Sequence, residues 1–534
     1  TMTDRLILTG NRFEVYFRDW QSCLFLGMTI LYLLPIWSIQ FFPTQDGPSH
    51  VYNALIIKEY FNTDQYPLFR QYYNLNLQPM PNWFGHAVMA ILMFALNPLI
   101  AEKLMLTGYV VLFLYSGRYL IISVDPAKKG LPFILFPFVY NYLLQMGFYN
   151  FSYSLGFCLL AIGYWWKHHQ QLQIKPAILF NLIMVCCYFS HMVSAVIALL
   201  SVAILWLVTI RPTNYQRHLL QIPMLFPSCI LPLWFIFSHG TKSNRAHWES
   251  QRLYDYFTRL EILFSFNRFQ IYLGQAIAAC FLLLFLLKIL TEKIDWERRR
   301  PSAEKSDGFL LVSLICLILY IYVPDGMSGG GFITHRLSLY PFLILLPWLT
   351  LTKWRFVKIC GSGLLVLIAL VNFVYMIDLY PKLDKDMQEF RAGLAKVAPN
   401  SRILPLIFDS HGQCQRIGMF LHAIGYYCAY TGGIEWDNYE ANTNYFPVRF
   451  KPELNGIRPD LGVIEGRPRD MDVHRHVELV DFIYTWSMPT DSPVQQRIET
   501  DYKLVFEQKR TRIYQRRPIA SSRSTQKLPS GIDN

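Results

Sequence analysis

Charged residues are scarce in this sequence of 534 residues: only 16% are Asp, Glu, Lys or Arg, whereas 53% are hydrophobic. Soluble domains carry about 25% charged residues, so the composition excludes an ordinary soluble protein and predicts an integral membrane protein. The net charge of +12 does not indicate a nucleic-acid partner. The basic residues lie in the gaps between apolar segments, where they act as topology signals beside anionic lipid.

Cysteine motifs and processing signals are also lacking. The sequence contains no C-x-x-C pair and no zinc-ligand spacing. The polar stretch of about twenty residues at the start has no small-residue cleavage site, so we expect the first apolar segment to stay in the membrane. Most of the ten cysteines lie inside apolar segments. Only Cys414 and Cys428 lie in a polar region, and a disulfide between them is an open alternative if that region faces an oxidising compartment.

Long apolar segments are abundant instead. A membrane-spanning helix needs about 20 mainly apolar residues, and several of the segments are shorter, which favours helices that end at a cavity within the membrane. We predict about 11 transmembrane helices. The segments are 22–40, 102–122, 131–146, 150–166, 177–190, 192–210, 219–237, 271–290, 308–323, 337–352 and 357–377.

The distribution of Lys and Arg predicts the topology. If segment 82–98 lies in the interface and does not cross, the inside loops hold most of the basic residues although the outside loops are longer. If it crossed, every later loop would invert and this bias would be lost. The sequence therefore predicts an inside N-terminus. The outside face then carries loop 41–101, loop 238–270, the Gly-rich loop 324–336 and everything after 378.

The composition changes after residue 377. We expect residues 1–377 to form a transmembrane domain with a first external loop at 41–101, and residues 378–517 to form an extracytoplasmic α/β domain large enough for its own core. The tail 518–534 is expected to be disordered. The predicted elements of the polar domain are a helix at 384–397 and strands at 402–408, 502–506 and 512–514.

The stretch Gln45-Asp46-Gly47-Pro48-Ser49-His50 directly follows the first apolar segment. An ionisable side chain at the membrane boundary is by default a candidate functional group, so Asp46 is our candidate catalytic carboxylate. The alternative is that Asp46 caps the next helix. His50 lies four residues later and would face the same way on a helix. The two could share a divalent cation such as Mg²⁺ or Mn²⁺, although two ligands are a weak metal signal.

Other polar residues of the outside face are candidate substrate-binding groups. Arg336 follows a run of glycines, and a guanidinium there suits a phosphate, although it could also extend from the interface into water. Asn150 could equally cap a helix, and His191 could equally be a core histidine. The further candidates are His335, beside Arg336, and Lys242 and Arg245 in loop 238–270.

The order of these features resembles the GT-C superfamily of membrane glycosyltransferases. The shared pattern is the acidic motif at Asp46 directly after the first span, an external segment before the second, and a soluble domain at the end of the chain. Gly147-Phe148-Tyr149-Asn150-Phe151, Ser190-His191 and His335-Arg336-Leu337 look like segments of uncharacterised bacterial members. The resemblance covers about residues 1–377.

The resemblance implies an inverting transfer of a sugar from a polyprenyl-phosphate donor to an external acceptor, in the cytoplasmic membrane of a bacterium. Asp46 would be the catalytic acid/base and Arg336 the partner of the lipid phosphate. Asn150 stands where many members carry a second acidic residue, which argues against a metal bridged by two carboxylates. The other classes left open are a lipid or glycan transporter and a non-catalytic subunit of a membrane complex. The partners expected are the lipid-linked sugar and membrane lipid.

Overall fold

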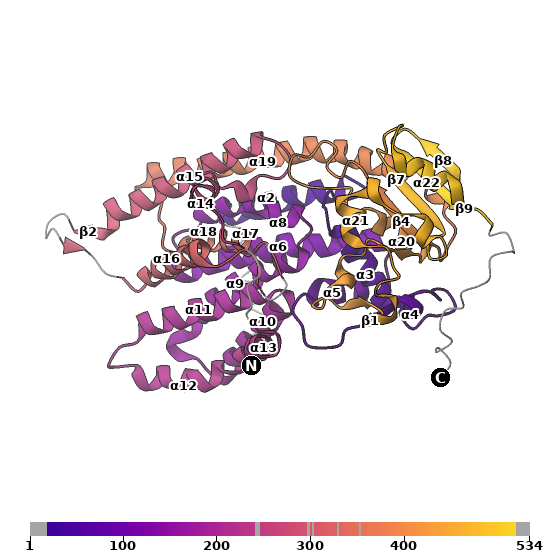
Figure 1. Ribbon diagram of the computed structural model, residues 1–534. Helices are drawn as coiled ribbons and strands as arrows, with labels where there is room; N and C mark the ends of the chain where they lie inside the picture. The colour runs from indigo at the N-terminus through magenta and orange to yellow at the C-terminus, as the bar shows by residue number, and fades with distance from the viewer. Residues whose placement is uncertain are drawn as a thin grey trace, which may run out of the picture.

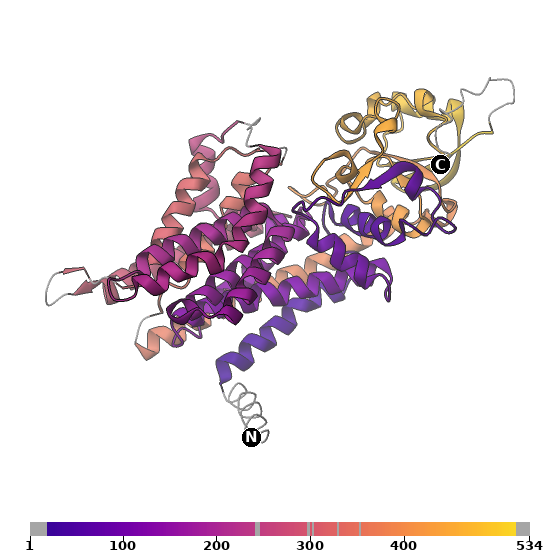
Figure 2. The ribbon, with the colours of Figure 1, turned by 90° about the horizontal axis from the view of Figure 1, so that it is seen from below.

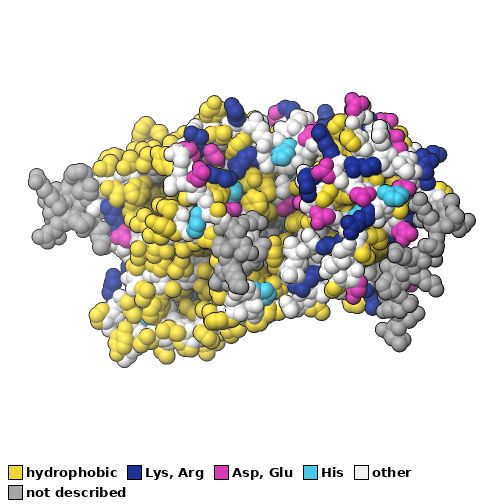
Figure 3. Space-filling view, viewed as in Figure 1, with side chains coloured by type: hydrophobic (Ala, Val, Ile, Leu, Met, Phe, Trp, Pro, Cys, Tyr) yellow, Lys and Arg dark blue, Asp and Glu magenta, His cyan; other side chains and the backbone are white. Residues whose placement is uncertain are grey.

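The computed structural model describes residues 19–240, 246–295, 300–301, 304–327, 330–351 and 354–518. The molecule is elongated, with a helical half and a half that holds the C-terminal sheet (Figures 1 and 2). Hydrophobic side chains cover the helical half on the face seen in Figure 3, whereas acidic and basic side chains gather over the sheet half. This division is typical of a membrane part joined to a polar domain. The predicted tail lies outside the described residues, apart from Pro518.

Each segment that the sequence predicts as a span contains helix, but α18 covers only six residues of segment 337–352. Within the described ranges, five are long and apolar enough to cross a membrane, or six if the pair α12–α13, bent by 53°, forms one span. Length and hydropathy therefore identify fewer membrane-spanning helices in the described ranges than the predicted number of about 11. The five helices are α2 (Trp20–Trp37), α6 (Pro98–Val124), α11 (Met192–Thr209), α15 (Phe269–Lys288) and α19 (Arg355–Phe390). The others are α9 (Tyr149–His168), α10 (Ile174–Ser190), α12 (Tyr215–Leu225), α13 (Pro227–His239), α16 (Asp307–Tyr322) and α18 (Tyr340–Leu345).

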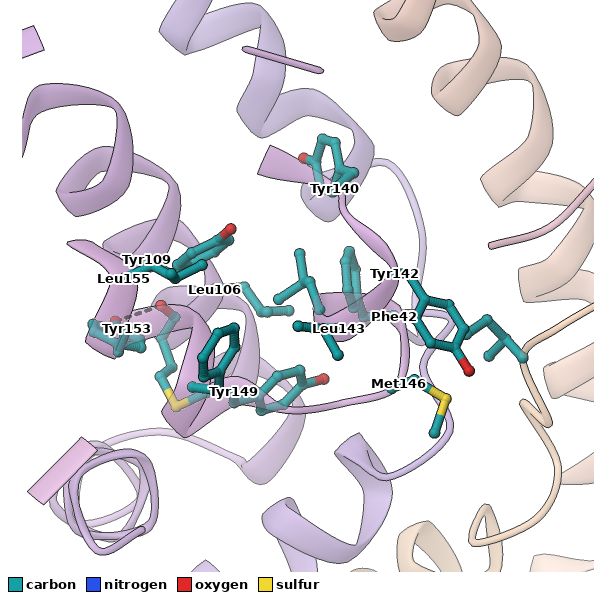
Figure 4. Close-up of a cluster of buried hydrophobic side chains, with 14 of the residues drawn as sticks. Phe42, Leu106, Tyr109, Tyr140, Tyr142, Leu143, Met146, Tyr149, Tyr153 and Leu155 are labelled. Carbon is teal, nitrogen blue, oxygen red and sulfur yellow. Dashed lines mark hydrogen bonds between the residues drawn. The ribbon is translucent and has the colours of Figure 1, made fainter. Parts of the chain in front are cut away.

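The predicted span 131–146 is broken into three short pieces. They are η1 (Leu131–Leu135), α7 (Phe136–Val139) and α8 (Tyr142–Gln145). Asn141 explains the last break, since its Oδ1 accepts hydrogen bonds from the backbone N–H groups of Leu143 and Leu144 at 3.0 and 3.2 Å and so starts a new helix. Large side chains around this segment form the buried cluster of Figure 4. The hydroxyls of Tyr109 and Tyr153 donate to the backbone carbonyls of Val139 and Met105 at 2.9 and 2.6 Å. The hydroxyl of Tyr149 donates to the carboxylate of Glu102 at 2.7 Å.

The first loop, residues 41–101, folds into elements that are each shorter than a membrane span. They are α3 (Gly47–Glu59), α4 (Phe69–Tyr72), β1 (Tyr73–Leu75) and α5 (Phe84–Leu92). The nine residues of α5 span about 14 Å at 1.5 Å per residue, half the thickness of the hydrocarbon core. Segment 82–98 is therefore too short to cross, as the distribution of basic residues predicts.

The C-terminal half contains a five-stranded sheet in the order β5-β4-β7-β9-β8. Strand β4 is parallel to β5 and β7, while β7–β9 and β8–β9 are antiparallel. The strands expected around 402, 502 and 512 are confirmed. The strands are β4 (Arg402–Ile407), β5 (Ile434–Glu435), β7 (Phe482–Trp486), β8 (Tyr502–Gln508) and β9 (Thr511–Arg516). The helices of this half are α20 (Ile424–Thr431), α21 (Leu461–Gly466) and α22 (Pro493–Asp501), with the 3₁₀ turn η6 at Glu440–Asn442.

Several contacts join the halves, among them a long helix and a strand pair. Helix α19 passes residue 377 without a break and ends at Phe390, so the helix expected at 384–397 is the end of α19 followed by the 3₁₀ turn η5 (Leu394–Lys396). Strand β1 of the first loop pairs with β6 (Val448–Phe450) in the C-terminal half. Cys414 and Cys428 are both buried free thiols in the structure.

Candidate functional site

A cavity of about 480 Å³ lies between the first loop, the apolar helices and the C-terminal half. Small-molecule sites usually measure roughly 300–1,000 Å³. The first loop contributes Gln45, Asp46 and His50 to its wall, and the C-terminal half contributes His422 and Glu465. The cavity is therefore shared by segments at opposite ends of the chain.

Asp46 is a buried carboxyl group in the wall of this cavity. It occupies the position before α3, yet its side chain caps no backbone N–H of that helix. Its Oδ1 instead accepts a hydrogen bond from Gln45 Nε2 at 3.2 Å and lies 3.5 Å from Nε2 of His422. The capping role that the sequence left open is therefore not the one this carboxyl performs.

The surroundings of Asp46 make it an unusually strong base for a carboxylate. Burial raises the pKa of the Asp46 carboxyl to about 8. The nearby negative charges of Glu440 and Glu465 add to this increase, whereas hydrogen bonds from Gln45 and Tyr439 oppose it. A group of this pKa accepts a proton from a hydroxyl more readily than an ordinary aspartate does.

A turn at Gly147 fixes the backbone of Asp46. The backbone N–H of Asp46 donates to the carbonyl of Met146 at 3.2 Å. Gly147 has φ +87°, and a Cβ at this position would lie 2.8 Å from Cβ of Asp46 and 2.6 Å from the backbone N of Gly47. Both the backbone conformation and the close contact require glycine.

We expect the substitution Gly147→Ala to destabilise the protein by about 2 kcal/mol, because it combines a positive φ with a backbone clash. Thermal unfolding in detergent would measure this as a lower Tm. Gly27→Ala in α2 is the matched control, since a Cβ there meets no atom within 4 Å. Equal Tm values for the two variants would contradict a tight contact at Gly147.

His422 lies between two carboxyl groups. Its Nε2 faces Asp46, and its Nδ1 lies 4.0 Å from Oδ2 of Asp437. Burial lowers the pKa of the His422 imidazole to about 3, so the ring is neutral at neutral pH. A neutral ring places no positive charge beside Asp46, which is consistent with the raised pKa of that carboxyl.

His50, His86 and Glu440 form a second buried cluster next to the cavity. Nδ1 of His50 lies 2.6 Å from Oε1 of Glu440, and Nε2 of His86 lies 2.7 Å from Oε2. The two ring nitrogens are 3.2 Å apart. His50 therefore lines the cavity beside Asp46 but binds Glu440, so Asp46 and His50 are not placed to share a metal through these atoms.

Arg336 supplies positive charge to the cavity. It lies on α17 (Ile333–Leu337), with its guanidinium carbon 4.7 Å from the ring centre of Phe148 and one N–H donated to the carbonyl of Gly331. Burial lowers the pKa of Arg336 to about 10, so the group stays charged at neutral pH. Among the described residues, no carboxylate lies within 4 Å of it to form an ion pair.

The remaining candidates have other surroundings. Asn150 lines the cavity but joins two helices, since its Oδ1 accepts from the N–H of Gly85 at 2.6 Å. His191 also lines the cavity, and its Nδ1 accepts from the backbone N–H of Val193 as a cap of α11. His335 does not line it and packs against Trp248, 4.6 Å between ring centres. Lys242 and Arg245 lie outside the described residues.

The C-terminal contribution to the site is not among the residues that the sequence analysis predicts. His422, Tyr439, Glu440 and Glu465 all belong to the C-terminal domain. One signal was present: Glu435, Asp437 and Glu440 lie within a single apolar and aromatic stretch. Three acids in such a stretch are costly to bury unless they bind something.

Comparisons with known proteins give matches among solved structures alone. No family model and no curated protein matches the chain. Among solved structures, the chain is similar to the crystal structure of ArnT from Cupriavidus metallidurans in the apo state. The match covers 92% of this chain and 97% of that one, with 10% sequence identity and a TM-score of 0.49.

Proposed function

We propose that this protein is a membrane glycosyltransferase that moves a sugar from a polyprenyl-phosphate donor to the hydroxyl of an acceptor. The observation that supports this most directly is that Asp46 and Arg336 line the same cavity. The carboxyl of Asp46 has a pKa of about 8, and the guanidinium of Arg336 has no carboxylate partner among the described residues. Glycosyl transfer from a phosphate needs a base at the acceptor and a cation at the leaving group.

Apolar side chains support a lipid donor. Val193 of α11, Phe235 of α13 and Ile333 of α17 line the same cavity as the polar groups. A prenyl chain matches such a wall, while the phosphate and the sugar match the polar end. Helices apolar enough to cross a membrane run up to this junction, so a donor held in the bilayer is near the site.

The chemistry balances as a single inverting displacement. Asp46 takes the proton of the acceptor hydroxyl while that oxygen forms a bond to the anomeric carbon. The bond between the anomeric carbon and the phosphate oxygen breaks, and the electron pair leaves with the phosphate. Arg336 stabilises the charge that develops there through bidentate hydrogen bonds. His422 supports the orientation of the Asp46 carboxylate.

The direct test is purification of the whole chain, extraction of its lipids and identification of any bound polyprenyl-phosphate sugar by mass spectrometry. The labelled form of that lipid is then reconstituted with the protein in vesicles, and transfer of label to extracted envelope acceptors is measured. Movement of the intact lipid between leaflets without loss of the sugar would instead indicate a transporter. Neither bound lipid nor transfer would favour a non-catalytic subunit.

The pH dependence follows from the pKa of Asp46. The base must be deprotonated to act, so kcat/KM is expected to rise with pH and to level off above a midpoint near 8. Activity should fall tenfold per pH unit below that midpoint. A profile already flat between pH 5 and 7 would contradict Asp46 as the base, since those values lie far above an ordinary aspartate pKa of about 3.9.

A further inference from the structure

We propose that His50, His86 and Glu440 bind a divalent transition-metal ion, with zinc the best match, and that this ion fastens the first external loop to the C-terminal half. The inference does not depend on the proposed transfer reaction. One ligand atom from each of the three residues lies within 4.8 Å of the others, and all three side chains are buried. They come from α3, α5 and η6.

The two polar contacts of the His86 ring indicate a positive charge in this cluster. Nδ1 of His86 lies 3.0 Å from the carbonyl oxygen of Asn82 and 3.4 Å from Nδ2 of Asn150. The closer carbonyl is an acceptor and favours a proton on this nitrogen. In a neutral ring Nε2 then has a lone pair, yet it faces Oε2 of Glu440 at 2.7 Å. Two lone pairs at that separation repel each other. Either a second proton on the ring or a metal ion must lie between them.

The separation of the two ring nitrogens fits a metal ion. Zinc bonds of about 2.0–2.1 Å in a tetrahedron place neighbouring ligand atoms about 3.3 Å apart. Nδ1 of His50 and Nε2 of His86 are 3.2 Å apart. Two facing ring nitrogens at this separation form at most one hydrogen bond to each other, whereas a shared ion satisfies both. Rotation of the Glu440 carboxylate would bring its oxygen from 2.6–2.7 Å to the same separation.

The groups around the ligands match those of known metal sites. A histidine ligand usually donates its other N–H to a carbonyl, and a carboxylate ligand is usually hydrogen-bonded in turn. His86 contacts the carbonyl of Asn82 in this way, and Glu440 accepts from Nδ2 of Asn53 at 3.1 Å. Two imidazoles and one carboxylate favour zinc over Mg²⁺ or Ca²⁺, which prefer oxygen ligands.

The position of the site gives the ion a structural role. Ligands from α3, α5 and η6 join two parts of the chain that also meet at the β1–β6 pair and at hydrogen bonds from Tyr52 and Asn53 of α3 to Gly433 and Asn438. Asp46 lies at the start of α3, the helix that carries His50. Loss of the ion would therefore loosen the element that positions Asp46.

The test is metal analysis of the whole chain purified with a tag that lacks histidine. We expect about one zinc ion per chain in the wild type and less than about a tenth of an ion in His86→Gln. Chelation should lower the Tm of the wild type and leave that of His86→Gln unchanged. His169→Gln is the matched control, because His169 is also buried but contacts the carbonyl of Trp166.

X-ray absorption at the zinc edge should show only nitrogen and oxygen neighbours. A wild type that purifies without metal and whose Tm does not rise with added zinc would overturn the proposal and assign the positive charge to a doubly protonated histidine. Equal zinc content in wild type and His86→Gln would also overturn it. These readouts are independent of sugar transfer.

Discussion

The substitution Asp46→Asn is expected to lower kcat for sugar transfer about 10²–10⁴-fold, the usual contribution of a general base. Asparagine has nearly the same shape and can still accept the hydrogen bond from Gln45, but it cannot take a proton. Binding of the lipid donor should change little. Initial rates with labelled donor, together with the Tm, would separate loss of chemistry from loss of folding.

Asp384→Asn is the matched control. Asp384 is also buried, its Oδ1 accepts from the backbone N–H of Phe41 at 2.7 Å, and it does not line the cavity. The amide oxygen of asparagine can replace that contact, so transfer should stay near the wild-type rate. Full activity of Asp46→Asn, or equal losses in both variants, would remove Asp46 from the catalytic role.

The substitution Arg336→Gln is expected to lower kcat/KM for the lipid donor about 10–100-fold. A hydrogen bond to a charged group contributes about 1.5–3 kcal/mol, and the guanidinium is the charged donor that the cavity offers to a phosphate. Arg336→Lys should recover only part of the loss, because an ammonium cannot form the two parallel hydrogen bonds. Steady-state kinetics over a range of donor concentrations would measure both variants.

Arg252→Gln removes the same charge away from the cavity. Its guanidinium carbon lies 4.2 Å from the ring centre of Trp248, and it is not part of the cavity wall. Its kinetics should match the wild type. If both arginine variants lost activity equally, a general effect of positive charge on the lipid surface would explain the result better than a contact at Arg336.

The local part of the fold could be predicted from the sequence. Apolar segments, the polar stretch at Asp46 and the short strand sequences near 402 and 502 are properties of neighbouring residues. Asp46 enters the cavity because a short break directly follows α2, and that break is visible in the sequence. Segment 131–146 was harder, since its overall hydropathy hides the new helix start at Asn141.

The composition of the site could not be predicted, because it depends on contacts between distant residues. His86 and Glu440 are 354 positions apart, yet they are in direct contact. No periodicity relates such residues, and a buried histidine has no sequence signature until its partner is known. For the same reason the sequence suggests only the local pair of Asp46 and His50. In the structure His50 contacts Glu440 at 2.6 Å and Asp46 lies 3.5 Å from His422, and both of these partners belong to the C-terminal half.

Helix α19 runs for 36 residues, about 54 Å at 1.5 Å per residue, from apolar surroundings into the base of the sheet. Asp384 near its far end holds the backbone of Phe41, five residues before Asp46. A change in the tilt of α19 would therefore move Asp384 and, through it, the backbone of Phe41. A helix changes its tilt in a thinner or thicker bilayer, so the thickness of the surrounding membrane can change the geometry around Asp46.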